Sequence, residues 1–352
     1  MDVHHHHHFL SLFFIFLFIQ LLPFASPSPS LAANKERCHP EDKTTLLDFK
    51  KSFSNHEGTL FQWTPDSDCC DWNSIQCDEK TNRVTRLTLL YSSVAGTIPD
   101  AVGRLTHLQM LRLHKLPNLI GQIPPSITKL KALDYLAITW TNISGPIPPF
   151  LAELQNLKFL LLSFNSLSGS IPPELSRLPN IVGIELDRNR LTGEIPESFG
   201  HFVGSVPGLR LSHNMLSGQI PKSLGNSDFS SIDLSRNQLV GDAFMFFNAS
   251  KSTSTIDISR NMLEFDLSGV RFPSTNLISL DISHNRVFGR IPSQITEAIY
   301  LQFLNVTYNR LCGEIPQGWK LKYRSQSFDE SSYLHNRCLC GPPLQPCKAD
   351  GN

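Results

Sequence analysis

Three aspartates have the spacing that most directly suggests a catalytic site. Asp233, Asp257 and Asp281 recur every 24 residues, and Arg236 and Arg260 follow two of them at the same offset. Paired carboxylates serve general acid–base catalysis and the hydrolysis of sugar chains. If each 24-residue unit adds one strand to a sheet, however, these carboxylates lie on an open face beside arginines, with no cleft to exclude water. We therefore expect charge pairing in solvent and no enzyme.

The cysteines are the second set of reactive residues, and they could form disulfides or bind a metal. Eight cysteines form one group near each end of the chain, and none lies between the groups. An even number in an exported chain predicts disulfides, whereas the adjacent Cys69 and Cys70 cannot easily share one tetrahedral zinc ion. Each group allows three pairings. Simple sequential pairing gives Cys38–Cys69, Cys70–Cys77, Cys312–Cys338 and Cys340–Cys347.

The N-terminal residues indicate export. Phe9–Phe24 is almost wholly apolar, which is the length of a signal-peptide core and short for a membrane span, and Ser30-Leu31-Ala32 offers a cleavage site. The histidines at 4–8 precede this core and would be removed with it, so we assign them no metal. We predict a signal peptide over residues 1–33, no membrane span, and a secreted protein of the extracellular space, the cell wall or apoplast.

Composition excludes one class of partner. The chain has 31 Lys and Arg against 31 Asp and Glu, and 40% of its residues are hydrophobic. This is the composition of a folded protein without the basic excess that nucleic-acid binding calls for. We expect no nucleic-acid partner.

A repeat occupies the middle of the chain and positions these residues. Two units lack its Gly-x-Ile-Pro tetrapeptide but keep the phase through Asn237 and Asn261, so ten 24-residue units are expected over residues 81–318. The eight tetrapeptides begin at Gly96, Gly121, Gly145, Gly169, Gly193, Gly218, Gly289 and Gly313.

Each unit is expected to start with a short strand. In Ile184–Asn189 apolar residues alternate, so that Glu185 and Asp187 should point outward. An asparagine follows three residues after the second inward residue in seven units. Stacked inside the turn, these amides can satisfy buried backbone groups of their own and neighbouring coils. The asparagines are Asn165, Asn189, Asn214, Asn237, Asn261, Asn285 and Asn309.

Stacked units bury leucines that one unit alone cannot, so both ends need covers. We predict an N-terminal cap over residues 34–80, with a helical stretch at Thr44–Phe53, and a C-terminal cap and tail over residues 319–352. The predicted fold is an α/β repeat solenoid. It is a right-handed superhelix with a concave parallel β-sheet and disulfide-stapled N- and C-terminal caps.

These residues carry a family resemblance. The unit x-x-Leu-x-Leu-x-x-Asn-x-Leu-x-Gly-x-Ile-Pro resembles the plant extracellular leucine-rich repeat. The motif Asp-Cys-Cys-Asp-Trp at 68–72, the irregular units at 241–243 and 265–267, and Cys338–Leu344 resemble polygalacturonase-inhibiting proteins over essentially the whole mature chain. Residues 202–207 and 241–247 are most similar to the family's floral-organ-regulator branch, and a plant antifreeze protein is related.

The resemblance implies an inhibitor whose concave sheet occupies the substrate cleft of secreted fungal endopolygalacturonases. Ten strands would span roughly 45 Å. Such a face is close to the size of a protein interface and too open for a small molecule. We therefore expect a monomer with a protein partner, with pectin as a second candidate and no cofactor. The alternatives are a signalling or developmental module that binds a peptide or a receptor ectodomain, and an antifreeze, ice-binding protein.

The register of the strands predicts which residues contact a partner. Tyr135, Trp140, Phe159, Leu161 and Phe164 would form an exposed apolar patch, which is typical of interface hot spots. Other outward positions of the central coils are Thr139, Glu185, Asp187, Arg210, Ser212, His213, Asp233, Arg236, Asp257, Arg260 and Asp281. The same register places further residues outward at Arg86, Thr88, Tyr91, Arg112, His114, Lys115, Arg188, Phe303, Asn305 and Tyr308. Three Asn-x-Ser/Thr motifs predict N-glycosylation at Asn142, Asn248 and Asn305.

Overall fold

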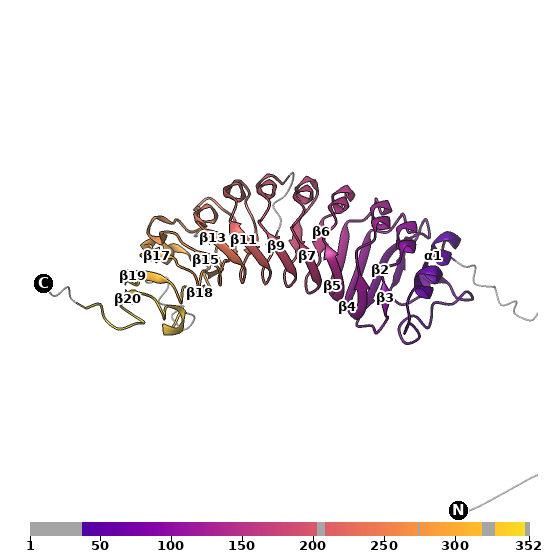
Figure 1. Cartoon of the computed structure of the whole chain (residues 1–352), viewed down its shortest axis with the longest axis horizontal. Coiled ribbons are helices and arrows are strands. Elements are labelled where there is room, and N and C mark those ends of the chain that lie inside the picture. The colour runs from indigo at the N-terminus through magenta and orange to yellow at the C-terminus, as the bar shows by residue number, and fades with distance from the viewer. Residues whose placement is uncertain (1–36, 203–207, 274, 319–327, 349–352) are drawn as a thin grey trace, which may run out of the picture. The chain divides into compact units, whose positions relative to one another are not determined.

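In the computed structural model the repeats stack as coils, and each of the ten predicted units contributes one strand to a parallel sheet in the described part of the chain (Figure 1). Each strand is hydrogen-bonded to its neighbours in the preceding and following coils. The strands are β2 (Val84–Leu90), β4 (Met110–Gly121), β5 (Tyr135–Pro146), β6 (Phe159–Leu161), β8 (Gly183–Glu185), β10 (Gly208–Arg210), β12 (Ser231–Asp233), β14 (Thr255–Asp257), β16 (Ser279–Asp281) and β18 (Phe303–Asn305).

The structure describes residues 37–202, 208–273, 275–318 and 328–348. All of the described residues belong to one compact unit, Arg37–Asn352. The predicted signal peptide with its cleavage site, residues 203–207 and much of the predicted C-terminal tail lie outside the described residues. Among the described helices, none combines the length and apolar character needed to cross a bilayer.

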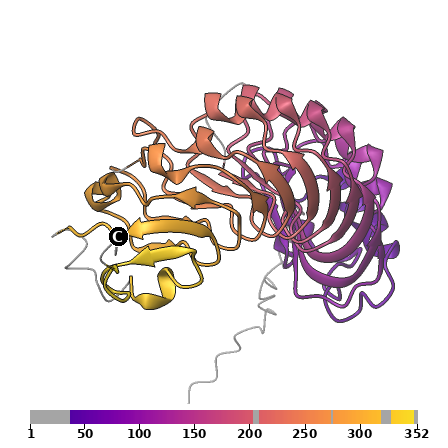
Figure 2. The same ribbon diagram turned by 60° about the vertical axis from the view of Figure 1, so that its left-hand side comes forward.

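The parallel sheet lines the inner, concave side of the stacked coils, and short 3-10 helices lie along the outer side (Figures 1 and 2). The repeats therefore use 3-10 turns where an α/β repeat would carry α-helices. Most of them start just after the proline of Gly-x-Ile-Pro, which caps the turn. They are η2 (Asp100–Arg104), η3 (Pro125–Lys129), η4 (Pro149–Glu153), η5 (Pro173–Arg177), η6 (Glu197–His201), η7 (Lys222–Asn226), η8 (Phe244–Phe246), η9 (Leu267–Gly269) and η10 (Ser293–Glu297).

A second row of short strands follows the turn after the concave strand. In coils two and three, β4 and β5 run through the turn and serve both rows. The glycine of the tetrapeptide has a positive φ here, for example 77° at Gly193, a conformation that glycine adopts without strain. The strands of this row are β3 (Gly96–Thr97), β7 (Ser166–Gly169), β9 (Arg190–Gly193), β11 (Met215–Gln219), β13 (Gln238–Gly241), β15 (Met262–Leu263), β17 (Phe288–Gly289) and β19 (Arg310–Glu314).

The predicted asparagine ladder holds the turns together. Nδ2 of Asn189 donates to the carbonyl oxygens of Leu162 in the previous coil and of Leu186 in its own, at 2.9 and 3.0 Å. Its Oδ1 accepts from the amide of Leu167 at 3.0 Å. Five other predicted asparagines repeat this pattern, and Asn336 of the C-terminal cap extends it by one step that the sequence prediction missed. Asn165 makes the same donated bonds, but its Oδ1 accepts from the amide and hydroxyl of Thr141. Buried backbone groups are thus satisfied from coil to coil.

The N-terminal cap is built on α1 (Pro40–Lys51). The helix begins four residues before the predicted start and ends two before the predicted end. Pro40 and two acidic residues suit a first turn, since the proline needs no hydrogen-bond partner for its nitrogen and carboxylates are favoured at the helix N-terminus. Asp42, 1% exposed, accepts two hydrogen bonds from Arg83 and one from the amide of Val84, which joins the helix to β2.

Disulfides fasten both caps in the sequential pairing. Cys38–Cys69 and Cys70–Cys77 tie α1, η1 (Cys69–Asp71) and β1 (Ile75–Cys77) together, and β1 pairs antiparallel with β2. Cys312–Cys338 joins β19 to β20 (Cys338–Cys340), and Cys340–Cys347 closes the end of the described chain. The remaining element, η11 (Glu330–Ser332), lies beside β18. Every cysteine is paired, so the described residues leave no thiolate for a metal.

Candidate functional site

The concave sheet aligns side chains of successive coils in rows. Parallel register places Tyr135 beside Phe159 in one row. A second row crosses the sheet two residues further along each strand. It contains Ala137, Leu161, Glu185, Arg210, Asp233, Asp257, Asp281 and Asn305. These residues are exposed or half-buried except Ala137, so the predicted contact face does reach solvent.

The structure brings the five residues of the predicted apolar patch together. The rings of Tyr135 and Phe159 lie 5.7 Å apart, and those of Trp140 and Phe164 stack at 3.7 Å. Trp140 is 46% exposed and Phe159 is 36% exposed. Leu161, which lies between the two ring pairs, lines a hollow of about 210 Å³ together with Tyr135, Trp140 and Phe164. A ring surface of this kind, left open to water, is typical of a contact site.

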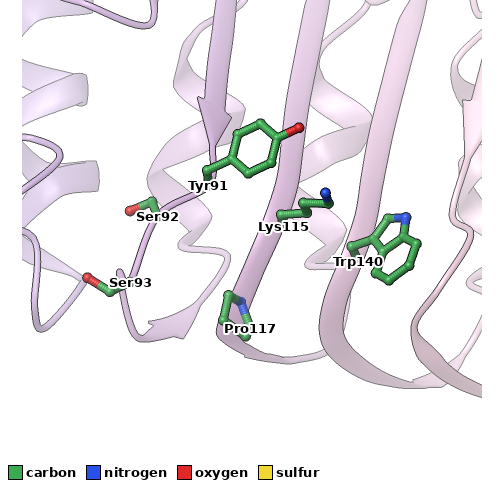
Figure 3. A pocket seen from close by; sticks show the side chains of 6 residues that line it. All are labelled: Tyr91, Ser92, Ser93, Lys115, Pro117 and Trp140. Atoms are coloured by element: carbon green, nitrogen blue, oxygen red, sulfur yellow. The ribbon is translucent and has the colours of Figure 1, made fainter.

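A second hollow, of about 450 Å³, adjoins the patch at its N-terminal end. Tyr91, Lys115 and Trp140 follow one another on three successive coils there (Figure 3). The ammonium group of Lys115 lies 4.8 Å from the ring centre of Tyr91 and 5.7 Å from that of Trp140. The sequence prediction did not identify this hollow, because Pro117 and the serines at 92 and 93 that complete it lie outside the regular strand pattern.

The aspartate row behaves differently from the prediction. The expected pairing of Asp233, Asp257 and Asp281 with arginines is wrong within the described residues, where no ion pair involves them. Instead Oδ1 of each accepts from the amide of the serine two residues on, at 2.9 to 3.0 Å. The aspartates therefore close the turn, and one oxygen of each carboxylate is used by the backbone.

Burial changes the acidity of two carboxyl groups on this face. Desolvation, with smaller contributions from Asp233 and Asp281, raises the pKa of Asp257 to about 6. Burial also raises the pKa of Glu185, although Arg210 lies 3.8 Å away and opposes the rise. Both groups lie on the open concave sheet, Glu185 beside Arg210 and Asp257 between Asp233 and Asp281.

Other predicted residues have structural partners. Asp187 accepts a hydrogen bond from Ser163 at 2.5 Å, and Thr139 Oγ1 lies 2.8 Å from Nδ1 of His114. Ser212 is buried at 4%, so its predicted outward position is wrong; the chain has already turned inward there. Among the glycosylation motifs, Asn142 and Asn248 are exposed, whereas Asn305 is half-buried and bonded to Asp281.

One residue per coil adopts the left-handed backbone conformation, in the turn between the concave strand and the second row of strands. Its φ lies between 52° and 60° in all ten coils and once more in the C-terminal cap. We call this row the αL ridge. Its members are Tyr91, Lys115, Trp140, Phe164, Arg188, His213, Arg236, Arg260, His284, Tyr308 and His335.

Family comparisons agree with the coil architecture. Residues 39–78 match the leucine rich repeat N-terminal domain. Residues 156–178, 180–202, 208–227 and 276–297 match the leucine rich repeat.

Whole-chain comparisons identify the family. A polygalacturonase inhibitor of Pyrus communis is 54% identical over 96% of this chain and 99% of its own. The leucine-rich repeat protein FLOR 1 of Arabidopsis thaliana is 56% identical over 67% of this chain and 72% of its own. The crystal structure of a plant ice-binding protein superposes with a TM-score of 0.85 at 44% identity, covering 90% of this chain and 100% of the other. With a full-length inhibitor so similar to it, the chain belongs to the polygalacturonase inhibitor family of leucine-rich repeat proteins.

Proposed function

We propose that this protein is secreted and inhibits fungal endopolygalacturonases by covering their substrate cleft with its concave face. The observation that carries the proposal is the open apolar patch of Tyr135, Trp140, Phe159, Leu161 and Phe164 in a chain that aligns with polygalacturonase inhibitors over nearly its full length. Rings that remain exposed on a rigid sheet can be buried by a partner without a large loss of side-chain entropy.

The geometry supports steric blocking and gives no support to catalysis. A cleft-bound polymer is excluded when a protein surface of several hundred Å² occupies the cleft, and roughly 800 Å² per partner is usual for a stable complex. The aspartates of the row are poorly placed for acid–base catalysis, since one oxygen of each carboxylate accepts a hydrogen bond from the backbone. Its charge can instead orient a basic partner and speed association.

The experiment is an inhibition titration. Purified mature protein is added to a panel of fungal endopolygalacturonases, and the release of reducing ends from polygalacturonate is measured. We expect inhibition of at least one enzyme at micromolar protein. Trp140→Ala should weaken it about tenfold or more, as for an interface hot spot.

Phe244→Ala is the matched control, because Phe244 is 43% exposed on η8, on the outer side of the coils. It should leave inhibition unchanged. No inhibition across the panel would overturn the proposal. Equal loss of inhibition in both variants would also do so, because the effect would then not depend on the concave face.

A second candidate is a signalling module, favoured by the 56% identity to FLOR 1. It would place a peptide or a receptor ectodomain on the same face and predicts no inhibition at any protein concentration. An ice-binding role, suggested by the similar solved structure, requires a regular array of small polar groups, whereas this concave face carries rings and charges. A thermal-hysteresis measurement on the same preparation tests that role directly.

A further inference from the structure

The αL ridge has a composition that its backbone conformation does not favour. A left-handed residue is least strained as glycine and is next best tolerated as asparagine or aspartate. In all eleven positions this chain places a large ring or a cation instead, each at a cost of about 1 kcal/mol or more. No member of the ridge carries a negative charge. Strained positions that keep large side chains are candidates for recognition.

The ridge contains two stacked runs. In the first, Trp140 stacks on Phe164 at 3.7 Å, Lys115 lies over the outer side of Trp140, and Arg188 lies 4.9 Å from the ring centre of Phe164. In the second, Tyr308 is stacked between His284 and His335, at 4.1 Å from each. Both faces of Trp140, Phe164 and Tyr308 therefore have a neighbouring ring or cation.

Covered faces decide which ligands the ridge can take. A sugar ring binds an aromatic side chain through its open face, and Trp140, Phe164 and Tyr308 each have a neighbour on both faces. Their edges remain, and the edge of an aromatic ring carries partial positive charge. Together with lysine and arginine, the ridge presents a positive line that suits carboxylate and carbonyl oxygens.

Between the two runs the cations have no partner in the described part of the chain. Arg236 and Arg260 form no ion pair and no ring contact there, and Nδ1 of His213 is buried without a hydrogen-bond partner. Burial and the neighbouring arginines lower the pKa of His213. The charge available for binding at this point therefore comes from the arginines.

The aspartate row runs beside this segment, three residues earlier in each coil. Asp233 precedes Arg236, and Asp257 precedes Arg260, so a negative and a positive line lie next to each other without pairing. A uniformly anionic polymer laid along the coils would be attracted by one line and repelled by the other. A protein surface can carry both signs.

We propose that Arg236, Arg260 and the adjoining ridge bind an acidic segment on the surface of a protein partner, while the aspartate row meets basic residues of the same partner. The proposal rests on the proposed function in using the same face, and it adds the chemistry of the partner. The two charge lines fix the direction in which that partner docks, because reversal would place like charges together.

The test uses a fluorescent peptide, (Glu-Lys)6, whose extended form carries acids on one side and lysines on the other. Its binding to the full-length mature protein is measured by anisotropy, beside a labelled oligogalacturonate of matched length. We expect the peptide to bind more tightly, and the double variant Arg236→Glu/Arg260→Glu to weaken its binding at least tenfold. The matched control is Arg190→Glu/Arg286→Glu, which reverses two exposed arginines outside the ridge.

Each outcome decides the proposal. Peptide binding that is absent, or that changes equally in both double variants, overturns it. Tighter binding of oligogalacturonate, lost in the Arg236/Arg260 variant, also overturns it and assigns the ridge to a polysaccharide. No endopolygalacturonase enters this assay. Inhibition without ridge-dependent peptide binding would therefore contradict this inference alone. Ridge-dependent peptide binding without inhibition would contradict the proposed function alone.

Discussion

The two halves of the concave face differ in chemistry although they share one scaffold. Coils three and four present paired rings and Leu161, whereas coils seven and eight present aspartates beside arginines that form no ion pair within the described residues. The inward residues of both halves are buried leucine and isoleucine, and both carry the same asparagine ladder. The stack of coils therefore constrains only what points inward. The outward positions are free to supply apolar contact area in one half and charge in the other.

The largest expected effect tests whether the scaffold is the same in both halves. Asn261→Ala removes three donated hydrogen bonds and leaves the amide of Leu239 without its acceptor, so we expect a loss of about 3–5 kcal/mol in the free energy of unfolding. Asn189→Ala removes the equivalent bonds in the ring-bearing half and should cost the same within about 1 kcal/mol. Denaturant unfolding followed by circular dichroism measures both. A twofold difference between them would contradict the shared scaffold.

The next effect tests whether the ring-bearing half supplies affinity. Phe164→Ala removes the stack on Trp140 and the cation contact of Arg188, and should weaken inhibition roughly 30-fold, or about 2 kcal/mol. Because the ring is partly exposed, the variant should lose less than about 1.5 kcal/mol of stability. Titration of the most strongly inhibited enzyme measures the change in affinity, and surface-binding kinetics should show it mainly as faster dissociation.

Phe288→Ala serves as the control for that measurement. Phe288 is 41% exposed in β17, which belongs to the second row of strands and not to the concave sheet. Its removal should leave affinity unaltered. If Phe164→Ala instead unfolds the protein, the rings are structural and the comparison between the two halves loses its meaning.

A pH-dependent effect tests burial in the charged half. Because the folded protein holds the pKa of Asp257 near 6, above its ordinary 3.8, ionisation of this group is disfavoured in the fold. Its contribution to stability is complete below about pH 3.8 and is lost as the pH rises through 6. Asp257→Asn should therefore stabilise the protein by up to about 3 kcal/mol at pH 7 and by less than about 1 at pH 4.

Coil ten shows that asparagine is accepted at this position. Asn305 occupies the same row and accepts from the amide and hydroxyl of Thr307, as the aspartates accept from their serines. Melting temperatures of wild type and variant between pH 4 and 7 provide the measurement. Parallel curves over that range would show that Asp257 has an ordinary pKa.

The repeat made most of the fold predictable, because its inward apolar residues can only form the core and its regularly spaced asparagines satisfy the buried turns. The bounds of α1 were less accessible, since Pro40 and its acidic neighbours begin the helix before the first apolar residue. On the surface, alternation alone identified the rings that meet across coils. It could not reveal that Asp233, Asp257 and Asp281 bond to serines, or that Ser212 turns inward, because both depend on the turn that follows each strand.

The smallest expected effect separates steering from affinity. Asp233→Asn removes one charge from the aspartate row but keeps the oxygen that accepts from Ser235. We expect association with an inhibited endopolygalacturonase to slow about two- to fivefold at low salt, with dissociation nearly unchanged. The difference should vanish near 0.5 M NaCl, since exposed charges are then screened within a few ångströms. Surface-binding kinetics at three salt concentrations would show it, and a change in the dissociation rate instead would place Asp233 among the affinity-bearing contacts of the other half.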